Sequence, residues 1–183
     1  MEIKVKSNMK KAIRDIGNVP KKYVQKALVT SLNKMGKEVM TQAKRELKDA
    51  TGLKAGTVAK KMTKDKARRN DETYTIRIKS RYLNLIEFNA RQTKKGVSAK
   101  AWGKRKNYRG AFIGRGQNSG KELVFKKVRD SKRIKAVYGA SLPREFVRQD
   151  MEKIFNKKIK TRFPILFKNA LEFQMLKASG RIR

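Results

Sequence analysis

The chain has 183 residues, with 50 Lys and Arg against 15 Asp and Glu, which gives a formal net charge of +35 at pH 7. The absence of Cys and His excludes disulfides, Cys/His zinc sites, thiol nucleophiles and a Ser-His-Asp triad. Hydrophobic residues make up 38% of the chain, so it can bury a core, and we expect one domain over residues 1–183. No apolar run is long enough for a membrane span or a signal segment, so we expect a soluble protein made in the cytoplasm, without a membrane partner.

The first third predicts a long helix over about residues 20–49. Pro20 suits its first turn, and Gly52 suits its C-terminal cap. Gly36 inside the helix costs about 1 kcal/mol relative to alanine, which indicates close packing at that point. One apolar stripe runs along the helix at spacings of three and four: Val24, Leu28, Ser31, Leu32, Met35, Val39, Ala43 and Leu47.

Short helical segments are predicted on either side of this helix, at about 7–16 and 54–62. In the middle third the period changes to two, and the alternation over 73–79 predicts a strand. The turn Gln117–Gly120 is expected to join the segment 111–113 to the segment 123–125 as a hairpin. Four further strands complete an expected antiparallel meander, at about 97–103, 110–114, 121–128 and 133–138.

The last third returns to helix. Ser141 is a candidate N-cap with Pro143 in the first turn, and Pro164 is expected to kink or split the helix before its end near 177. The basic tail 180–183 is expected to be loose. The fold class is therefore α+β, an antiparallel β-sheet flanked by a long N-terminal helix and a long kinked C-terminal helix. The stripe of the last helix comprises Val147, Met151, Ile154, Phe155, Ile159, Phe163, Leu166, Phe167, Ala170 and Phe173.

The sequence offers poor material for catalysis. Its nearest carboxylate groupings are Asp71 with Glu72 and Asp150 with Glu152, and neither spacing places two carboxylates on one face. Gly114-Arg115-Gly116 lacks the Gly-Lys-Ser/Thr ending of a phosphate-binding loop and predicts a β-turn instead. We expect no enzyme activity, no metal site and no cofactor.

A basic, glycine-rich excursion over about 91–120 carries the main functional signal. Basic side chains alternate there with Trp102, Tyr108 and Phe112, a pattern that fits phosphates and stacked bases. Core packing is the favoured interpretation for Phe112, whereas Trp102 fits core and surface equally. The residues expected to face DNA or another polyanion are Lys94, Lys95, Lys100, Lys104, Arg105, Lys106, Arg109 and Arg115.

Nucleic acid is the first partner that this charge suggests, since neutralised phosphates release counterions. An acidic protein neighbour is a second possibility. No base-reading module is present, so recognition would not depend on base sequence. Composition alone leaves two candidate functions. The favoured one is a non-specific nucleic-acid-binding protein of the nucleoid or ribosome type, and the less favoured one is a nuclease.

Four short motifs follow one another along the chain. The long helix ends in Thr51-Gly52-Leu53-Lys54. A strand with Gly110-Ala111-Phe112 is followed by a turn and by Val124-Phe125-Lys126, and Ser141-Leu142-Pro143 begins the final helix. Motifs in this order resemble the minor tail protein Z family of long-tailed bacteriophages, the tail-completion proteins. The resemblance spans roughly residues 24–175.

The resemblance implies a structural, non-catalytic role in the virion. Such proteins complete the head-proximal end of the tail and enable head–tail joining, as rings that are commonly hexameric. The implied partners are tail terminator or tail-tube proteins, head-completion or neck proteins, and packaged DNA. The implied location is the tail-neck region of the virion, after assembly in the host cytoplasm.

Overall fold

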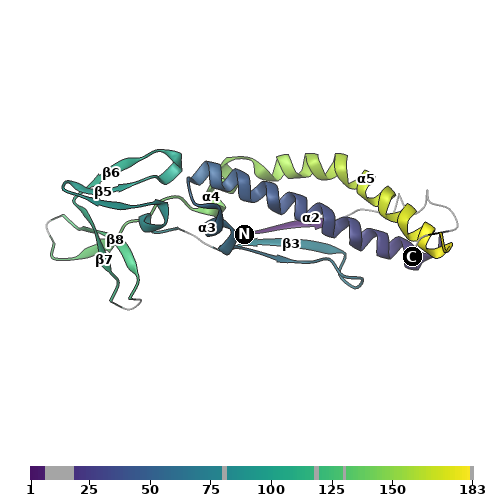
Figure 1. The fold of residues 1–183 in the computed structure, drawn as a ribbon. Coiled ribbons are helices and arrows are strands. Elements are labelled where there is room, and N and C mark those ends of the chain that lie inside the picture. Colours follow the sequence, from purple (N-terminus) through teal and green to yellow (C-terminus); the bar gives the residue numbers. More distant parts are fainter. Residues whose placement is uncertain (7–18, 80–81, 118–119, 130, 182–183) are drawn as a thin grey trace. The chain divides into compact units, whose positions relative to one another are not determined.

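The computed structural model describes residues 1–6, 19–79, 82–117, 120–129 and 131–181, so the helix expected at 7–16 lies outside the described residues. The chain forms two compact units (Figure 1). The first, here the helical unit, comprises Met1–Gln42, Thr63–Arg77 and Asp150–Arg183. The second, here the strand-rich unit, comprises Ala43–Met62 and Ile78–Gln149.

Helix α2 (Lys21–Thr51) confirms the long helix predicted from the apolar stripe, and every residue of that stripe is buried. Gly52 ends it with φ of 74° and an N–H that donates to the Lys48 carbonyl at 2.8 Å, which confirms the glycine cap. The close packing expected at Gly36 is also confirmed. A Cβ at position 36 would lie 2.2 Å from the ring of Tyr74.

The predicted last helix is two helices, α4 (Leu142–Arg148) and α5 (Met151–Ala178). The helix is interrupted at Asp150, whose φ of 49° is a left-handed value that a continuous α-helix does not contain. Three members of the predicted stripe, Val147, Ile154 and Phe173, are wrong as core positions, because these residues are 66%, 42% and 50% exposed.

Helix α5 continues through Pro164 without being split, and it bends along its course (Figure 1). The start of α4 follows the prediction in part. Pro143 lies in its first turn, and Ser141 occupies the N-cap position, but the Ser141 side chain makes no capping hydrogen bond.

Helices α2 and α5 pack together in the helical unit. The buried Ser31 hydroxyl lies 2.7 Å from the Ala27 carbonyl in its own helix and 3.1 Å from the Leu166 carbonyl in α5. At another point of the same helix pair, Lys158 of α5 donates to the side-chain oxygen of Gln42 of α2 at 3.1 Å. The serine predicted as part of the apolar stripe is therefore a polar link between the two helices.

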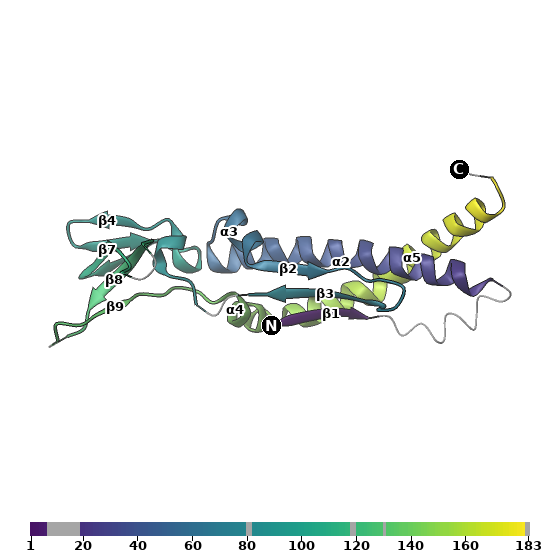
Figure 2. The ribbon, with the colours of Figure 1, turned by 90° about the horizontal axis from the view of Figure 1, so that it is seen from below.

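A three-stranded sheet completes the helical unit in the order β1-β3-β2 (Figure 2). Strand β3 was predicted, whereas β1 and β2 were not. Arg77 of β3 donates to Glu2 of β1 at 2.7 Å, and this guanidinium lowers the pKa of the Glu2 carboxyl. The bounds are Glu2–Lys6 for β1, Met62–Asp65 for β2 and Thr73–Ile78 for β3. Helix α3 (Ala55–Lys60) confirms the short helix predicted at about 54–62.

The strand-rich unit holds two more antiparallel sheets, so the single meander expected from the sequence is three separate sheets. Their orders are β4-β5-β6 and β7-β8-β9. The hairpin between β7 and β8 is confirmed, with Arg115 opposite Glu122. The strand expected at 97–103 ends at Ala99, and a short 3-10 helix, η2 (Ala101–Gly103), follows. The strands are Arg91–Thr93, Gly96–Ala99, Lys106–Arg109, Ala111–Arg115, Glu122–Lys127 and Ile134–Ala136 for β4 to β9.

A single buried amide ties strand β8 to the 3-10 helix η1 (Leu85–Phe88). The Asn84 side chain donates to the Val124 carbonyl at 3.1 Å and accepts from the Val124 N–H at 2.8 Å. Its oxygen also accepts from the Ile86 N–H at 3.0 Å, as the N-cap of η1. The α+β class with antiparallel sheets and a long helix near each end is confirmed.

Candidate polyanion-binding surface

The basic excursion folds into the β4-β5-β6 sheet and the strand that follows it. Each of its eight predicted cations is exposed. They come from turns and strand ends: the β4–β5 turn, the end of β5, the segment from η2 into β6, both ends of β6, and the last residue of β7. In chain order these are Lys94 and Lys95, Lys100, Lys104 and Arg105, Lys106 and Arg109, and Arg115.

A glycine at the start of β5 allows the backbones of β5 and β6 to approach closely. Gly96 has φ of 143° and pairs with Arg109 of β6. A Cβ there would lie 2.2 Å from the Tyr108 carbonyl oxygen, so no other residue fits without moving the β6 backbone. At the other end of the pair, Lys106 lies opposite Ala99. The strand thus presents a cation at each end.

The charge on this surface is not compensated locally. The 34 residues between Glu87 and Glu122 include ten Lys and Arg and no carboxylate. Within the part of the chain that the structure describes, none of the eight cations pairs with a carboxylate. Arg105 is oriented by neutral groups instead, since its guanidinium lies 3.1 Å from the Ser98 hydroxyl and 3.5 Å from the Asn89 carbonyl.

The three aromatic residues of the excursion have different positions. Phe112 is half-buried against Phe125, with ring centroids 6.0 Å apart, in agreement with the packing role favoured from the sequence. Tyr108 is half-buried, and burial raises the pKa of its hydroxyl. Trp102 is 42% exposed, and its indole N–H donates to the Glu145 carboxylate at 2.9 Å.

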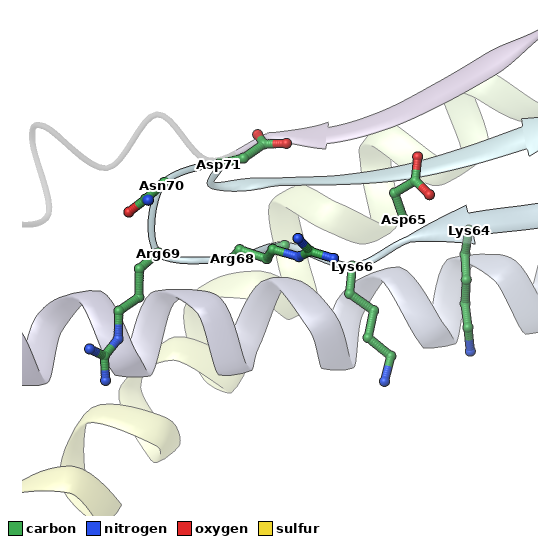
Figure 3. A pocket seen from close by; sticks show the side chains of 8 residues that line it. Lys64, Asp65, Lys66, Arg68, Arg69, Asn70 and Asp71 are labelled. Atoms are coloured by element: carbon green, nitrogen blue, oxygen red, sulfur yellow. The ribbon is translucent and has the colours of Figure 1, made fainter.

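A second basic surface, which the sequence reasoning missed, lies in the hairpin between β2 and β3. Residues 64–71 line an open hollow of about 1050 Å³ (Figure 3). Lys64 and Lys66 extend on the side opposite Asp65 and Asp71. The run of cations just before the predicted strand was the available signal: Lys64, Lys66, Arg68 and Arg69.

The backbone of this second surface is fixed on helix α2. The Asn33 side chain donates to the Ala67 carbonyl at 3.1 Å and accepts from the Ala67 N–H at 3.0 Å. Asp65 pairs with Arg77 of β3. The four hairpin cations have no carboxylate partner among the described residues.

Among the described residues no group of three or more Asp and Glu lies close enough to hold a metal ion. The β-turn predicted at Gly114-Arg115-Gly116 is wrong in position, because Gly114 and Arg115 are the last two residues of β7 and pair with Leu123 and Glu122 of β8. The turn begins after Arg115, and the Gly116 N–H donates to the Lys121 carbonyl across it. No helix in the described part of the chain has the length and apolar character of a membrane span.

Comparison with known proteins agrees with the motif order. The family model described as prophage minor tail protein Z (GPZ) matches residues 6–179 of the chain. The chain belongs to this family. No curated protein and no solved structure matches it.

Membership of the minor tail protein Z family makes the chain a structural protein of a phage tail and places it in the virion. The match covers all four motifs on which the resemblance rested, from the end of α2 to the start of α4. It also covers both basic surfaces, the excursion in the strand-rich unit and the β2–β3 hairpin in the helical unit.

Proposed function

We propose that this member of the minor tail protein Z family completes the head-proximal end of the tail and enables head–tail joining, without catalysis. The observation that carries the proposal is the set of eight exposed cations, unpaired among the described residues, in a phage tail protein. A tail must deliver DNA through its channel, and a basic surface holds DNA through its phosphates whatever the base sequence.

A ring of copies would multiply this charge around the channel. Closed rings with cyclic symmetry are a common way for a single chain to surround an axis, and we propose a hexamer. In the assembled neck the basic surface faces either packaged DNA or acidic neighbours among the tail-tube, terminator and head-completion proteins. An offset of that kind is expected, because a net charge of +35 on a compact chain repels itself.

The test is charge reversal at the three consecutive cations Lys104, Arg105 and Lys106, in a phage whose own copy is inactivated. All three side chains are exposed, so K104E/R105E/K106E should fold normally. We expect electron microscopy to show separate heads and tails, or joined particles that have lost DNA, and the infectious yield to fall by orders of magnitude.

The matched control reverses three exposed lysines of α5, Lys157, Lys160 and Lys168, and changes the net charge equally. It should keep most of the infectious yield. An unchanged yield from the 104–106 variant would contradict the role of this surface. Equal losses from both variants would mean that net charge alone matters.

The second candidate is a free, non-specific nucleic-acid-binding protein, which the net charge favours on its own. Purely electrostatic binding to DNA weakens by about 10³- to 10⁵-fold between roughly 50 and 200 mM salt. A protein that is part of a particle should stay associated across that range. Retention in particles at high salt therefore distinguishes the two functions.

A further inference from the structure

Trp102 has a backbone conformation that a bulky residue rarely adopts. Its φ and ψ are 54° and 36°, in the left-handed region that glycine adopts more easily. The next residue is a glycine, Gly103, yet Trp102 also has this conformation. A large side chain there is a strained outlier, and such residues persist only where the surroundings enforce them. Trp102 is also the single tryptophan of the chain.

Three contacts within the strand-rich unit fix the loop that carries Trp102. The Lys100 N–H donates to the Phe88 carbonyl at 2.8 Å. Gly52, at the end of α2, lies so close to the loop that a Cβ on it would be 2.6 Å from both the Lys100 oxygen and the Gly103 nitrogen. The loop backbone is therefore clamped between η1 and the C-terminal end of α2.

The third contact orients the indole ring itself. Glu145 of α4 is only 6% exposed, and its carboxylate accepts the indole N–H at 2.9 Å. A hydrogen bond to a buried carboxylate is stronger than one between neutral groups. The polar edge of the ring is thus held inward, while 42% of the residue stays open to solvent. The side chain is preorganised for contact with something outside the unit.

Exposed cations flank this ring on both sides in the chain: Lys100 before it, and Lys104, Arg105 and Lys106 after it. Duplex DNA offers phosphates to such cations but keeps its bases stacked inside, so it presents no free base on which a fixed indole could stack. Tryptophan and arginine, with tyrosine, are instead enriched among the few residues that carry most of the binding energy of protein–protein interfaces. The clamped aromatic therefore points to a protein as the partner.

We infer that Trp102 and the four cations that flank it in the chain form a docking surface for an acidic protein segment with an apolar side chain, supplied by a neighbouring protein of the particle. The inference rests on the proposed function, since it specifies what one part of the basic surface binds. The apolar side chain packs on the indole face, while the carboxylates of the segment meet the four cations. Charge supplies attraction, and the indole supplies specificity.

Two labelled peptides of equal length and equal Glu content test this surface by fluorescence anisotropy, one with Leu and one with Ser between the acidic residues. The wild-type protein should prefer the Leu peptide by about tenfold or more. Trp102→Gly should abolish that preference and bind both peptides alike, since glycine accepts the left-handed backbone. Tyr138→Ala removes another exposed aromatic side chain of the same unit and should keep the preference.

Emission from the single tryptophan gives a readout that needs no variant. Titration of the wild-type protein with the Leu peptide should shift the emission to shorter wavelength, because the ring leaves water, and the Ser peptide should shift it less. Equal affinity of the wild type for both peptides, or an unshifted emission, overturns the inference. So does a Trp102→Gly variant that loses affinity for single-stranded oligothymidine instead, since the indole would then stack on bases.

Failure here is distinct from failure of the proposed function. The peptide measurements use the purified chain, whereas head–tail joining is scored in the phage. A chain that fails the peptide test but is required for joining overturns only the docking surface. A chain that passes it but is dispensable for joining overturns tail completion as its function.

Discussion

Gly36 and Gly56 are both helical glycines, in α2 and α3, but their surroundings differ. A Cβ at position 36 would lie 2.2 Å from the Tyr74 ring, while nothing lies within 4 Å of one at position 56. Gly36→Ala should therefore destabilise the protein by about 1–3 kcal/mol through overpacking, despite the better helix propensity of alanine. Urea unfolding measures this difference.

Gly56→Ala is the matched control for that substitution. It introduces the same methyl group into open space and should stabilise the chain by up to about 1 kcal/mol. If Gly36→Ala were as stable as Gly56→Ala, the packing of α2 against β3 would differ from that described. The sequence predicted this close approach from the cost of an interior glycine, but it did not identify Tyr74 as the neighbour.

At the scale of elements, Asn84 holds η1 and β8 together through three hydrogen bonds of one buried side chain. Asn84→Ala should cost about 2–4 kcal/mol, because it leaves backbone groups of Val124 and Ile86 without this partner. Thermal unfolding followed by circular dichroism measures the loss. Asn107→Ala, at an exposed position in β6, should leave the midpoint nearly unchanged; a similar drop for both would contradict the linking role.

The elements that the sequence predicted correctly are those with a strong local pattern. Helix α2, strand β3 and the β7–β8 hairpin all carry their own periodicity or turn signal. Strand β1 was missed because its partner is β3, more than 60 residues away, and no local pattern reveals that pairing. The break between α4 and α5 at Asp150 was missed because the apolar residues keep their helical spacing across it. Val147 fits that spacing and is nevertheless exposed.

The candidate site was predictable in composition but not in geometry. The eight cations and their lack of local carboxylates follow from the sequence, and each proved to be exposed. Trp102 was undecided between core and surface. Its position depends on Glu145, 43 residues later, and on the close approach of the α2 cap at Gly52. These are tertiary contacts that composition and periodicity do not encode.

At the scale of the whole molecule, charge is distributed over both units. The strand-rich unit has 26 Lys and Arg against 6 Asp and Glu, and the helical unit has 24 against 9. Both surfaces described above therefore stand on a strongly basic background. Such a chain is expected to work next to acidic or phosphate-bearing partners, as the tail of a DNA-filled particle would provide.

The most direct test of the proposed role in tail completion is sedimentation of the tagged protein from the phage-producing host, after nuclease treatment and in high salt. Mass spectrometry then identifies what travels with it. Tail completion predicts that the protein sediments with tail-tube and neck proteins, because protein contacts in the particle survive when DNA is digested and electrostatic binding is screened. Release of the protein as a small free species would contradict the claim and favour a free nucleic-acid-binding protein.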